Sequence, residues 1–409
     1  MSKVQRADVV VIGAGAAGLA CARALTLAGR EVVVLEARDR IGGRVNTMRM
    51  ACGAIVELGA QVVHPTAEPA LDEVVRQAGL RTVPLARDAA VIVVDDGRRW
   101  EAAELMKERP PAPWVVEQWL GAVGRGTVAE ALEVLPQAAR RLAIAWLDQA
   151  IGGDSRTLDV LGVAAAREAR SNGTEQVLVD GFDRVAEWLA KGLDVRLESP
   201  VDTVSWADDR GELHAAERLS ASAVVVTVPP SVVRAGGLRF EPPLSGVRFD
   251  SLPRLASCDA VSVVLRASEA ATRSAWVLLA EPPGGLWRTT VGSAVVAGHV
   301  KGPRAAQARD RPWTTEDATR VVSKVDPHLG AVMDVELCDW GADPWARGAF
   351  PVPVAGADDA LRKWAEPVAG VLFFAGDAST NSTVRGLVQG AISSGRRAAA
   401  EVVEALGHG

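Results

Sequence analysis

Several features that would fix the class of this protein are scarce or absent. The 409-residue sequence has no tyrosine and only four cysteines, and no two cysteines stand in a CxxC or zinc-type spacing. Lysine and arginine (45) do not outnumber aspartate and glutamate (51), so the net charge is −6. No run of 18 apolar residues occurs. These absences argue against a disulfide framework, a structural metal, a nucleic-acid partner and a membrane span.

We therefore expect a cytoplasmic protein that acts on a small molecule. With 48% hydrophobic and 23% charged residues, the chain is long enough for two domains with a substantial core. The apolar run 9–12 is too short for a signal peptide and leads into a glycine loop, so we expect it to form a first strand.

Tryptophan is abundant where tyrosine is missing, with 12 residues against 6 phenylalanines. Most tryptophans fall in two middle blocks. They indicate either an aromatic-lined pocket for a flat apolar substrate or ordinary core packing, and for any single residue core packing is the more common role. The residues concerned are Trp100, Trp114, Trp119, Trp146, Trp276, Trp287, Trp340 and Trp345.

The N-terminal segment predicts a βαβ unit. A strand at 7–12, a helix at 16–28 and a strand at 31–35 follow in order, and Gly29 supplies the helix stop. Between the first strand and the helix, residues 13–18 match GxGxxG. In such a loop the first glycine makes the tight turn, the second admits a pyrophosphate and the third lets helix and strand pack closely.

Glu36 ends the second strand, eighteen residues beyond Gly18. A carboxylate there can accept hydrogen bonds from both ribose hydroxyls and repel a 2′-phosphate, which excludes NADP. The geometry of a βαβ unit alone does not show whether it binds NAD or FAD.

In the remaining sequence, two segments are expected to leave this unit and form a separate part of the structure. Residues 69–170 are interpreted as a separate helical layer. Strands are expected at 195–197, 201–206 and 224–228, then at 261–265, 275–279 and 294–297 in a second excursion. A last strand (371–375) and a last helix (388–406) close the chain.

The stretch EARDRIGGR at 36–44, directly after the GxGxxG unit, resembles the signature of the flavin amine oxidase family, which includes monoamine, polyamine and L-amino-acid oxidases. Further segments are similar to family motifs in the same order: ELGAQ (57–61), AVVVTVPP (223–230), Gly376-Asp377 and GLVQGA (386–391). The resemblance covers nearly the whole chain. It implies an FAD-dependent oxidoreductase.

The resemblance also implies which residues hold FAD. They lie in the glycine loop, the ribose-binding segment, the segment beneath the flavin, the adenine contact, the ribityl contact and the start of the last helix. These residues are Gly13, Ala14, Gly15, Ala17, Gly18, Glu36, Ala37, Arg38, Gly42, Gly43, Arg44, Gly59, Ala60, Gln61, Val201, Gly376, Asp377, Leu387 and Val388. The dipole of the last helix would stabilise an anionic reduced flavin.

The expected fold is therefore a Rossmann-type α/β FAD-binding domain with an interleaved α+β substrate domain that has a mixed sheet and helices. We assign residues 1–75, 177–254 and 365–409 to the FAD-binding domain. Residues 76–176 and 255–364 form the substrate-binding domain.

Only one dinucleotide fingerprint is present, so electrons must come from the substrate. The resemblance implies hydride transfer from an amine or amino acid to flavin N5, with O2 as the acceptor.

Three positions depart from the family pattern. Ser262 stands where the family has a lysine that is water-bridged to N5, and a serine supplies no basic nitrogen. Phe350 and Leu387 stand where monoamine oxidases have two tyrosines. Ala349 replaces the cysteine that attaches FAD in some members, so FAD should be non-covalent.

Three further residues are candidates on the substrate side. Arg385 and Arg288 could bind a substrate carboxylate, and His64 could line the pocket, although each of these residue types is more often structural. A desaturase or dehydrogenase acting on C–C or C–N bonds, and a non-catalytic flavin-bound scaffold, remain alternatives. A homodimer is possible.

Overall fold

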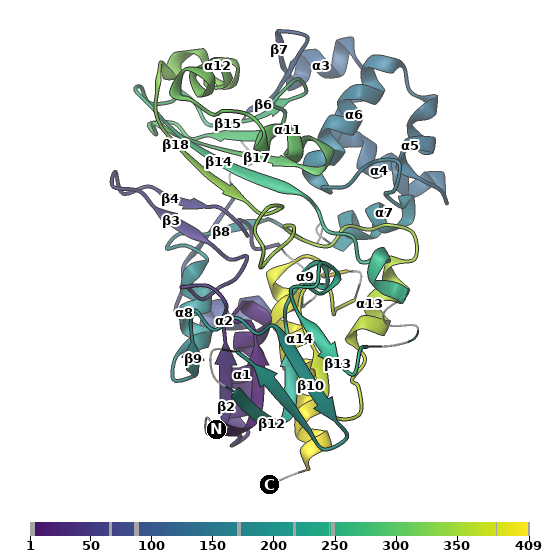
Figure 1. Ribbon diagram of the computed structural model, residues 1–409. Helices are drawn as coiled ribbons and strands as arrows, with labels where there is room; N and C mark the ends of the chain where they lie inside the picture. Colours follow the sequence, from purple (N-terminus) through teal and green to yellow (C-terminus); the bar gives the residue numbers. More distant parts are fainter. Residues whose placement is uncertain are drawn as a thin grey trace.

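The computed structural model describes residues 5–64, 68–85, 90–169, 173–215, 218–244, 246, 250–381 and 383–407. Two lobes are stacked along the long axis of the molecule, and each is built around its own large sheet (Figure 1). Both chain ends lie at the lower end of the view.

The sheet of the lower lobe has the order β13-β10-β11-β12-β1-β2-β9, and β19 pairs with β12. Its central strands β9, β2, β1, β12 and β19 are parallel, whereas β10, β11 and β12 form an antiparallel meander. The strands are β1 (Gln5–Ile12), β2 (Val32–Leu35), β9 (Asp194–Arg196), β10 (Thr203–Ala207), β11 (Arg210–His214), β12 (Arg218–Val226), β13 (Arg239–Glu241) and β19 (Leu372–Phe374).

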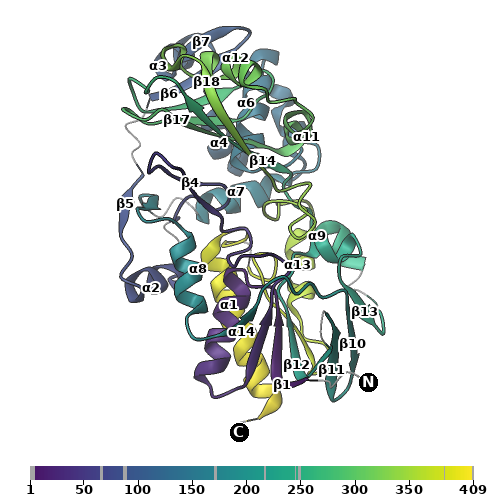
Figure 2. The same cartoon turned by 60° about the vertical axis from the view of Figure 1, so that its left-hand side comes forward.

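The apolar runs of this sheet are explained by burial on both faces. Val9 to Ile12 and Val32 to Leu35 are all buried, as expected for parallel strands covered by helices on one face and by further chain on the other. Helices of this lobe are α1 (Ala16–Leu27), α2 (Ala70–Gln77), α8 (Asp183–Ala190), α9 (Pro230–Arg234), α13 (Ala357–Ala365) and α14 (Val388–Leu406). In both views α1 and α14 run side by side (Figure 2).

The upper lobe contains a mixed sheet with the order β18-β14-β17-β16-β15-β6-β7. All its pairs are antiparallel except β15 with β6. The strands are β6 (Ala90–Asp95), β7 (Arg98–Glu101), β14 (Ala260–Ala267), β15 (Ala275–Leu279), β16 (Leu286–Thr289), β17 (Val295–Lys301) and β18 (Val332–Asp339).

Helices cover this second sheet, and several more lie beside it (Figure 1). They are α3 (Ala102–Glu108), α4 (Val116–Val123), α5 (Val128–Ala131), α6 (Gln137–Ala150), α7 (Val160–Ala169), α11 (Ala305–Arg309) and α12 (Thr315–Val325). Short 3-10 turns accompany them at η1 (Pro113–Val115), η2 (Leu132–Val134), η4 (Gly302–Arg304) and η5 (Pro327–Leu329), and another, η3 (Leu252–Arg254), contacts α9 and α13 of the lower lobe. Two small ribbons, β3 (Thr47–Arg49) with β4 (Ile55–Glu57) and β5 (Thr82–Pro84) with β8 (Gln176–Leu178), lie near the junction of the lobes.

The predicted fold class is confirmed, including the βαβ start and the closing helix at 388–406. The interpretation of residues 69–170 as helices alone is wrong, because β5, β6 and β7 fall inside that range. Asp96 and Gly97 both have positive φ (51° and 72°). They form the two-residue turn that matches the twist of an antiparallel hairpin.

Each of the two sheets is built from segments that are far apart in the sequence. The first sheet uses residues 5–35, 194–241 and 372–374, and the second uses 90–101, 260–301 and 332–339. The domain boundaries themselves stay a prediction. In the described part of the chain, no helix is both long enough and apolar enough to cross a membrane.

Candidate active site

A cavity of about 870 Å³ lies where the two lobes meet. Residues 12, 13, 15–17, 35–38 and 42–45 of the lower lobe line one end, and residues of the second sheet and of α6 line the other. The cavity brings together all but two of the residues expected to hold FAD.

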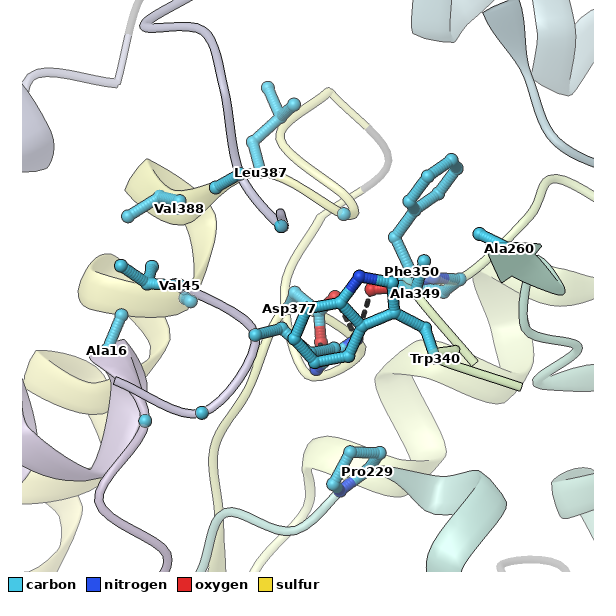
Figure 3. A pocket seen from close by; sticks show the side chains of 18 of the residues that line it. Ala16, Val45, Pro229, Ala260, Trp340, Ala349, Phe350, Asp377, Leu387 and Val388 are labelled. Atoms are coloured by element: carbon cyan, nitrogen blue, oxygen red, sulfur yellow. Dashed lines mark hydrogen bonds and ion pairs between the residues drawn. The ribbon is translucent and has the colours of Figure 1, made fainter. Parts of the chain in front are cut away.

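The helix α1 presents an unpaired N-terminus to this cavity. Its N-cap, Gly15, provides no side-chain hydrogen bond, and no acidic residue occupies the first turn. The first backbone N–H groups of the helix are therefore free to bind an anion, aided by the helix dipole. Gly15, Ala16 and Ala17 line the cavity at this point. Ala16 lies beside Val45 in Figure 3.

The two expected residues that do not line the cavity, Ala14 and Gly18, shape the loop instead. A Cβ at Gly18 would lie 2.0 Å from the Gly13 carbonyl oxygen, so only glycine lets the helix approach the loop so closely. Gly13 itself has φ +106°, which an L side chain rarely adopts. Ala14 donates its N–H to Glu36 Oε2 over 2.7 Å.

Glu36 is buried, with 4% of its surface exposed. Its other carboxylate oxygen accepts the Arg38 N–H over 3.0 Å. Each carboxylate oxygen has a second lone pair, and Glu36 lines the cavity. Two backbone N–H groups thus hold the carboxylate in place at the edge of the cavity.

Arg44 and Asp377 are brought together by the fold and pair with each other. Arg44 donates to the two carboxylate oxygens of Asp377 over 2.9 and 2.6 Å, and also to the Ala349 carbonyl over 2.9 Å. Both residues line the cavity beside Gly376. Arg38 is similarly held by both oxygens of Asp343 at 2.8 Å. Sequence reasoning treated these residues as separate contacts and missed their pairing.

The segment Gly59–Gln61 forms part of the cavity floor. The carbonyl just before it, that of Leu58, accepts hydrogen bonds from Ser262 Oγ at 2.7 Å and from Trp340 Nε1 at 2.8 Å. These bonds tie the segment to the second sheet.

Ser262 lies on β14 opposite His299 of β17, and its Oγ is 3.0 Å from His299 Nδ1. His299 Nε2 in turn contacts Gln61 Nε2. Burial lowers the pKa of His299 to about 3, with a smaller contribution from Lys301, so the imidazole is neutral. His299 was not predicted. The alternation of VVAGHVK at 295–301 would have placed it on the cavity face if the strand had been extended past residue 297.

Phe350 and Leu387 line the cavity, where they stand apart in the view and extend in the same direction (Figure 3). Ala349 precedes Phe350 and lies close to Asp377. Leu387 is the N-cap of α14 and provides no side-chain cap. Val388 begins the helix and faces the same space. The helix N-terminus is therefore aimed at the cavity, as expected from the sequence.

The three candidate substrate-side residues differ in their positions and contacts. Arg385 lines the cavity but already forms an ion pair with Asp358, and burial lowers its pKa to about 10. Arg288 is not among the lining residues, and its guanidinium lies 5.4 Å from the ring centre of Trp276. His64 lines the cavity, with Nδ1 3.1 Å from Glu175 Oε1.

The tryptophans divide between the hydrophobic cores and the cavity lining, and Trp340 belongs to both. Trp100 and Trp287 are buried in hydrophobic cores, and Trp119 packs against one. Five others line the cavity: Trp114, Trp146, Trp276, Trp340 and Trp345. Trp114 and Trp146 meet edge to face at 6.1 Å, and Trp146 Nε1 donates to Glu117 over 2.7 Å.

Comparison with known proteins agrees with this geometry. The family model of flavin-containing amine oxidoreductases matches residues 16–403. The chain belongs to that family. Lysine-specific histone demethylase 1B of Mus musculus is 25% identical over 442 residues, covering 97% of this chain and 52% of its own length. This chain thus spans about half the length of the first such relatives.

Putrescine oxidase of Kocuria rosea is 34% identical over 288 residues, covering 58% of this chain and 59% of that protein. Among solved structures, cyclohexylamine oxidase from Brevibacterium oxydans superposes with a TM-score of 0.82 at 22% identity and covers 98% of this chain and 99% of that one. At that identity the likeness supports the fold alone.

Family membership implies a flavin cofactor. The residues present fit FAD at the dinucleotide end: a free helix N-terminus, a buried acid one strand away, and glycines where backbone must approach closely.

Proposed function

We propose that the protein oxidises an amine that carries an apolar ring or chain, with FAD as non-covalent cofactor and O2 as acceptor. The observation that carries the proposal is that one cavity joins the FAD-binding features to a chamber walled by Trp114, Trp146 and Trp276. When bound, FAD would accept the hydride of the amine and pass the electrons to O2, which would give hydrogen peroxide and an imine that water hydrolyses.

The residues of this chain have definite roles in that scheme. The N-terminus of α1 and Glu36 bind the pyrophosphate and ribose, and Gly59–Gln61 support the ring. The N-terminus of α14, which has no side-chain cap, would stabilise negative charge on a reduced flavin. Ala349 provides no thiol for a covalent link. The tryptophans exclude water from the chamber, which strengthens electrostatic interactions inside it.

An amine is favoured over an amino acid, because neither arginine named for a carboxylate is available. Arg385 has Asp358 as its partner, and Arg288 lies outside the lining residues. Arg167 of α7 is the observation that keeps an amino acid as a second candidate. It lines the cavity, and no residue in the described part of the chain forms an ion pair with it.

One anaerobic screen tests both candidates. The FAD-loaded protein is mixed with amines, amino acids and non-nitrogenous cyclic compounds, and loss of the flavin absorbance is followed. We expect apolar amines to bleach the flavin and peroxide to appear when air is admitted.

Bleaching by non-nitrogenous compounds alone would instead support a desaturase or dehydrogenase, which Ser262 in place of the family lysine favours. A flavin that none of these compounds reduces would leave the non-catalytic scaffold as the explanation.

A further inference from the structure

A chain of polar contacts links the cavity floor to the second sheet at the position where the family has lysine. It runs from the Leu58 carbonyl to Ser262 Oγ (2.7 Å), and from there to His299 Nδ1 (3.0 Å). It ends with the contact between His299 Nε2 and Gln61 Nε2. Ser262, His299 and Gln61 all line the cavity.

The direction of each hydrogen bond follows from the first contact. A carbonyl oxygen has no proton, so the 2.7 Å contact requires Ser262 to donate its hydroxyl hydrogen to Leu58. Ser262 Oγ then accepts from His299, which must carry its proton on Nδ1. The opposite order would leave two acceptors facing each other across 2.7 Å.

The imidazole therefore has a lone pair on Nε2, and Gln61 must present its amide nitrogen to it. The same nitrogen lies 3.5 Å from the Glu57 carbonyl, which accepts the second amide hydrogen. This arrangement assigns the carboxamide orientation of Gln61 from its hydrogen-bond network.

His299 is not the base of this site. Both of its nitrogens are used in the chain, and burial together with Lys301 lowers its pKa to about 3. At neutral pH such a group holds a proton on Nε2 in far less than one molecule in a thousand.

The carboxamide oxygen of Gln61 takes no part in this chain of polar contacts. The structure gives Oε1 no hydrogen-bond partner among the described residues, and the atom is not among the buried side-chain atoms that lack partners. This oxygen is therefore not fully buried, and its residue lines the cavity.

We propose that Gln61 is a specificity-determining residue, whose Oε1 accepts a hydrogen bond from the amino group of the substrate. Ser262 and His299 are positioning residues that hold the carboxamide in that orientation. The inference rests on the proposed oxidation of an amine. A carbonyl oxygen accepts N–H from a neutral or a protonated amine, whereas a lysine ammonium at this place would repel a protonated one.

The tautomer of His299 tests the positioning chain without any turnover. The sequence has five histidines, so ¹⁵N-histidine labelling of the oxidised, FAD-loaded protein gives few imidazole signals, and His299→Leu identifies the one that matters. We expect a neutral ring protonated on Nδ1 from pH 5 to pH 8. A ring protonated on Nε2 would overturn the assigned orientation of Gln61.

Gln61→Glu is the matched probe, because it replaces the donating nitrogen with an oxygen. Glutamate cannot donate to Nε2 when ionised, but the Leu58 carbonyl still requires Ser262 to donate to it, so we expect His299 to keep its Nδ1 proton while its Nε2 signal shifts. A proton on Nε2 in this variant would contradict the bond directions assigned from the Leu58 contact.

Binding of the amino group is tested by anaerobic stopped-flow bleaching with cyclohexylamine, 2-phenylethylamine and tryptamine. With the fastest of these, we expect Gln61→Leu to raise the apparent Kd about tenfold, the usual effect of losing a hydrogen bond to a charged group. The limiting rate should change much less. Gln61→Glu keeps an acceptor oxygen and should bind the amine as well as the wild type or better.

Different outcomes would contradict the proposed function and the proposed role of Gln61. If no amine bleaches the wild-type flavin, the proposed function is wrong and Gln61 has no amine to bind. If amines bleach the wild type but Gln61→Leu keeps the wild-type apparent Kd, amine oxidation stands and the role of Gln61 is wrong. His299→Leu should raise the apparent Kd as well, and the double variant should be no worse than Gln61→Leu, because both residues act through one contact.

Discussion

At the residue scale, Glu57 shows how the fold alters a side chain that the sequence places in an FAD-associated motif. Its carboxylate accepts the Phe182 N–H at 2.8 Å and the Thr47 hydroxyl at 2.7 Å, yet burial outweighs both bonds and raises its pKa from 4.5 to about 7. The folded protein thus holds a proton that the unfolded chain releases above pH 4.5.

This shift predicts that Glu57 lowers stability as pH rises from about 4.5 to 7, because the unfolded state binds fewer protons than the folded state in that window. Glu57→Gln is neutral throughout. Its free energy of unfolding relative to wild type should therefore increase by about 1–3 kcal/mol between pH 4.5 and 7.5. Urea unfolding with excess FAD at each pH measures the difference.

Glu130 provides the control, because hydrogen bonds with Thr127 lower its pKa. Any stability it gives through ionisation is lost only below pH 4.5, so Glu130→Gln should show a constant offset from wild type across the same window. A constant offset for Glu57→Gln would contradict the raised pKa.

The candidate site was predictable at this scale where a residue type is dictated by the backbone or by the cofactor. Gly13, Gly18 and Glu36 stand in a local motif whose spacing alone fixes their geometry. His299 was not predictable in the same way. It meets Ser262 only because β17 pairs with β14, and that register depends on residues far apart in the sequence.

At the scale of elements, the contact between α1 and α14 fixes one side of the cavity. Gly395 of α14 faces α1 so closely that a Cβ there would lie 2.2 Å from the Ala17 carbonyl oxygen and 3.1 Å from the Cys21 nitrogen. Ala17 and Ala391, which belong to these helices, also line the cavity.

We predict that Gly395→Ala destabilises the protein by about 1–3 kcal/mol, because the helices must move apart, and that it weakens FAD retention. Gly121→Ala in α4 is the matched control. A Cβ there meets only the Ala164 Cβ at an ordinary 3.6 Å, so alanine should be neutral or stabilising. Thermal unfolding and the ratio of flavin to protein absorbance compare the two. Equal behaviour of both variants would contradict the close packing.

Elements also show why part of the fold escaped prediction. The strands and helices of the first lobe follow from local pattern, because each apolar run is short and bounded by turn residues. Residues 90–101 carry an equally local hairpin signal in VDDGR at 94–98, but the helical periodicity around it was extended across the segment. The parallel pairing of β6 with β15 joins segments almost 200 residues apart, which no local pattern encodes.

At the scale of the whole molecule, the cavity is walled by both lobes, and polar contacts next to it join them. Among these links are the bonds to the Leu58 carbonyl, the Arg38–Asp343 pair and the bond from Arg44 to Ala349. A ligand that fills the full length of the cavity therefore contacts both lobes, whereas one that fills only the glycine-loop end contacts the lower lobe.

FAD should consequently stabilise the whole molecule. A ligand at one hundred times its Kd that binds only the folded state adds about 2.7 kcal/mol to the free energy of unfolding, so we expect a rise of a few degrees in the unfolding midpoint when FAD is restored to the apoprotein. Tryptophan fluorescence, which reports mainly the upper lobe, and far-UV circular dichroism, which reports both, should shift together.

ADP separates the two ends of the cavity, because it carries the pyrophosphate and adenosine but no flavin. Its contacts would be with the α1 N-terminus, Glu36 and Val201, all in the lower lobe. ADP at the same multiple of its Kd should therefore shift the circular dichroism transition while leaving the tryptophan transition where it is in the apoprotein. If ADP moved both transitions as FAD does, coupling between the lobes would lie in the protein contacts, and the bound flavin ring would not be needed to join them.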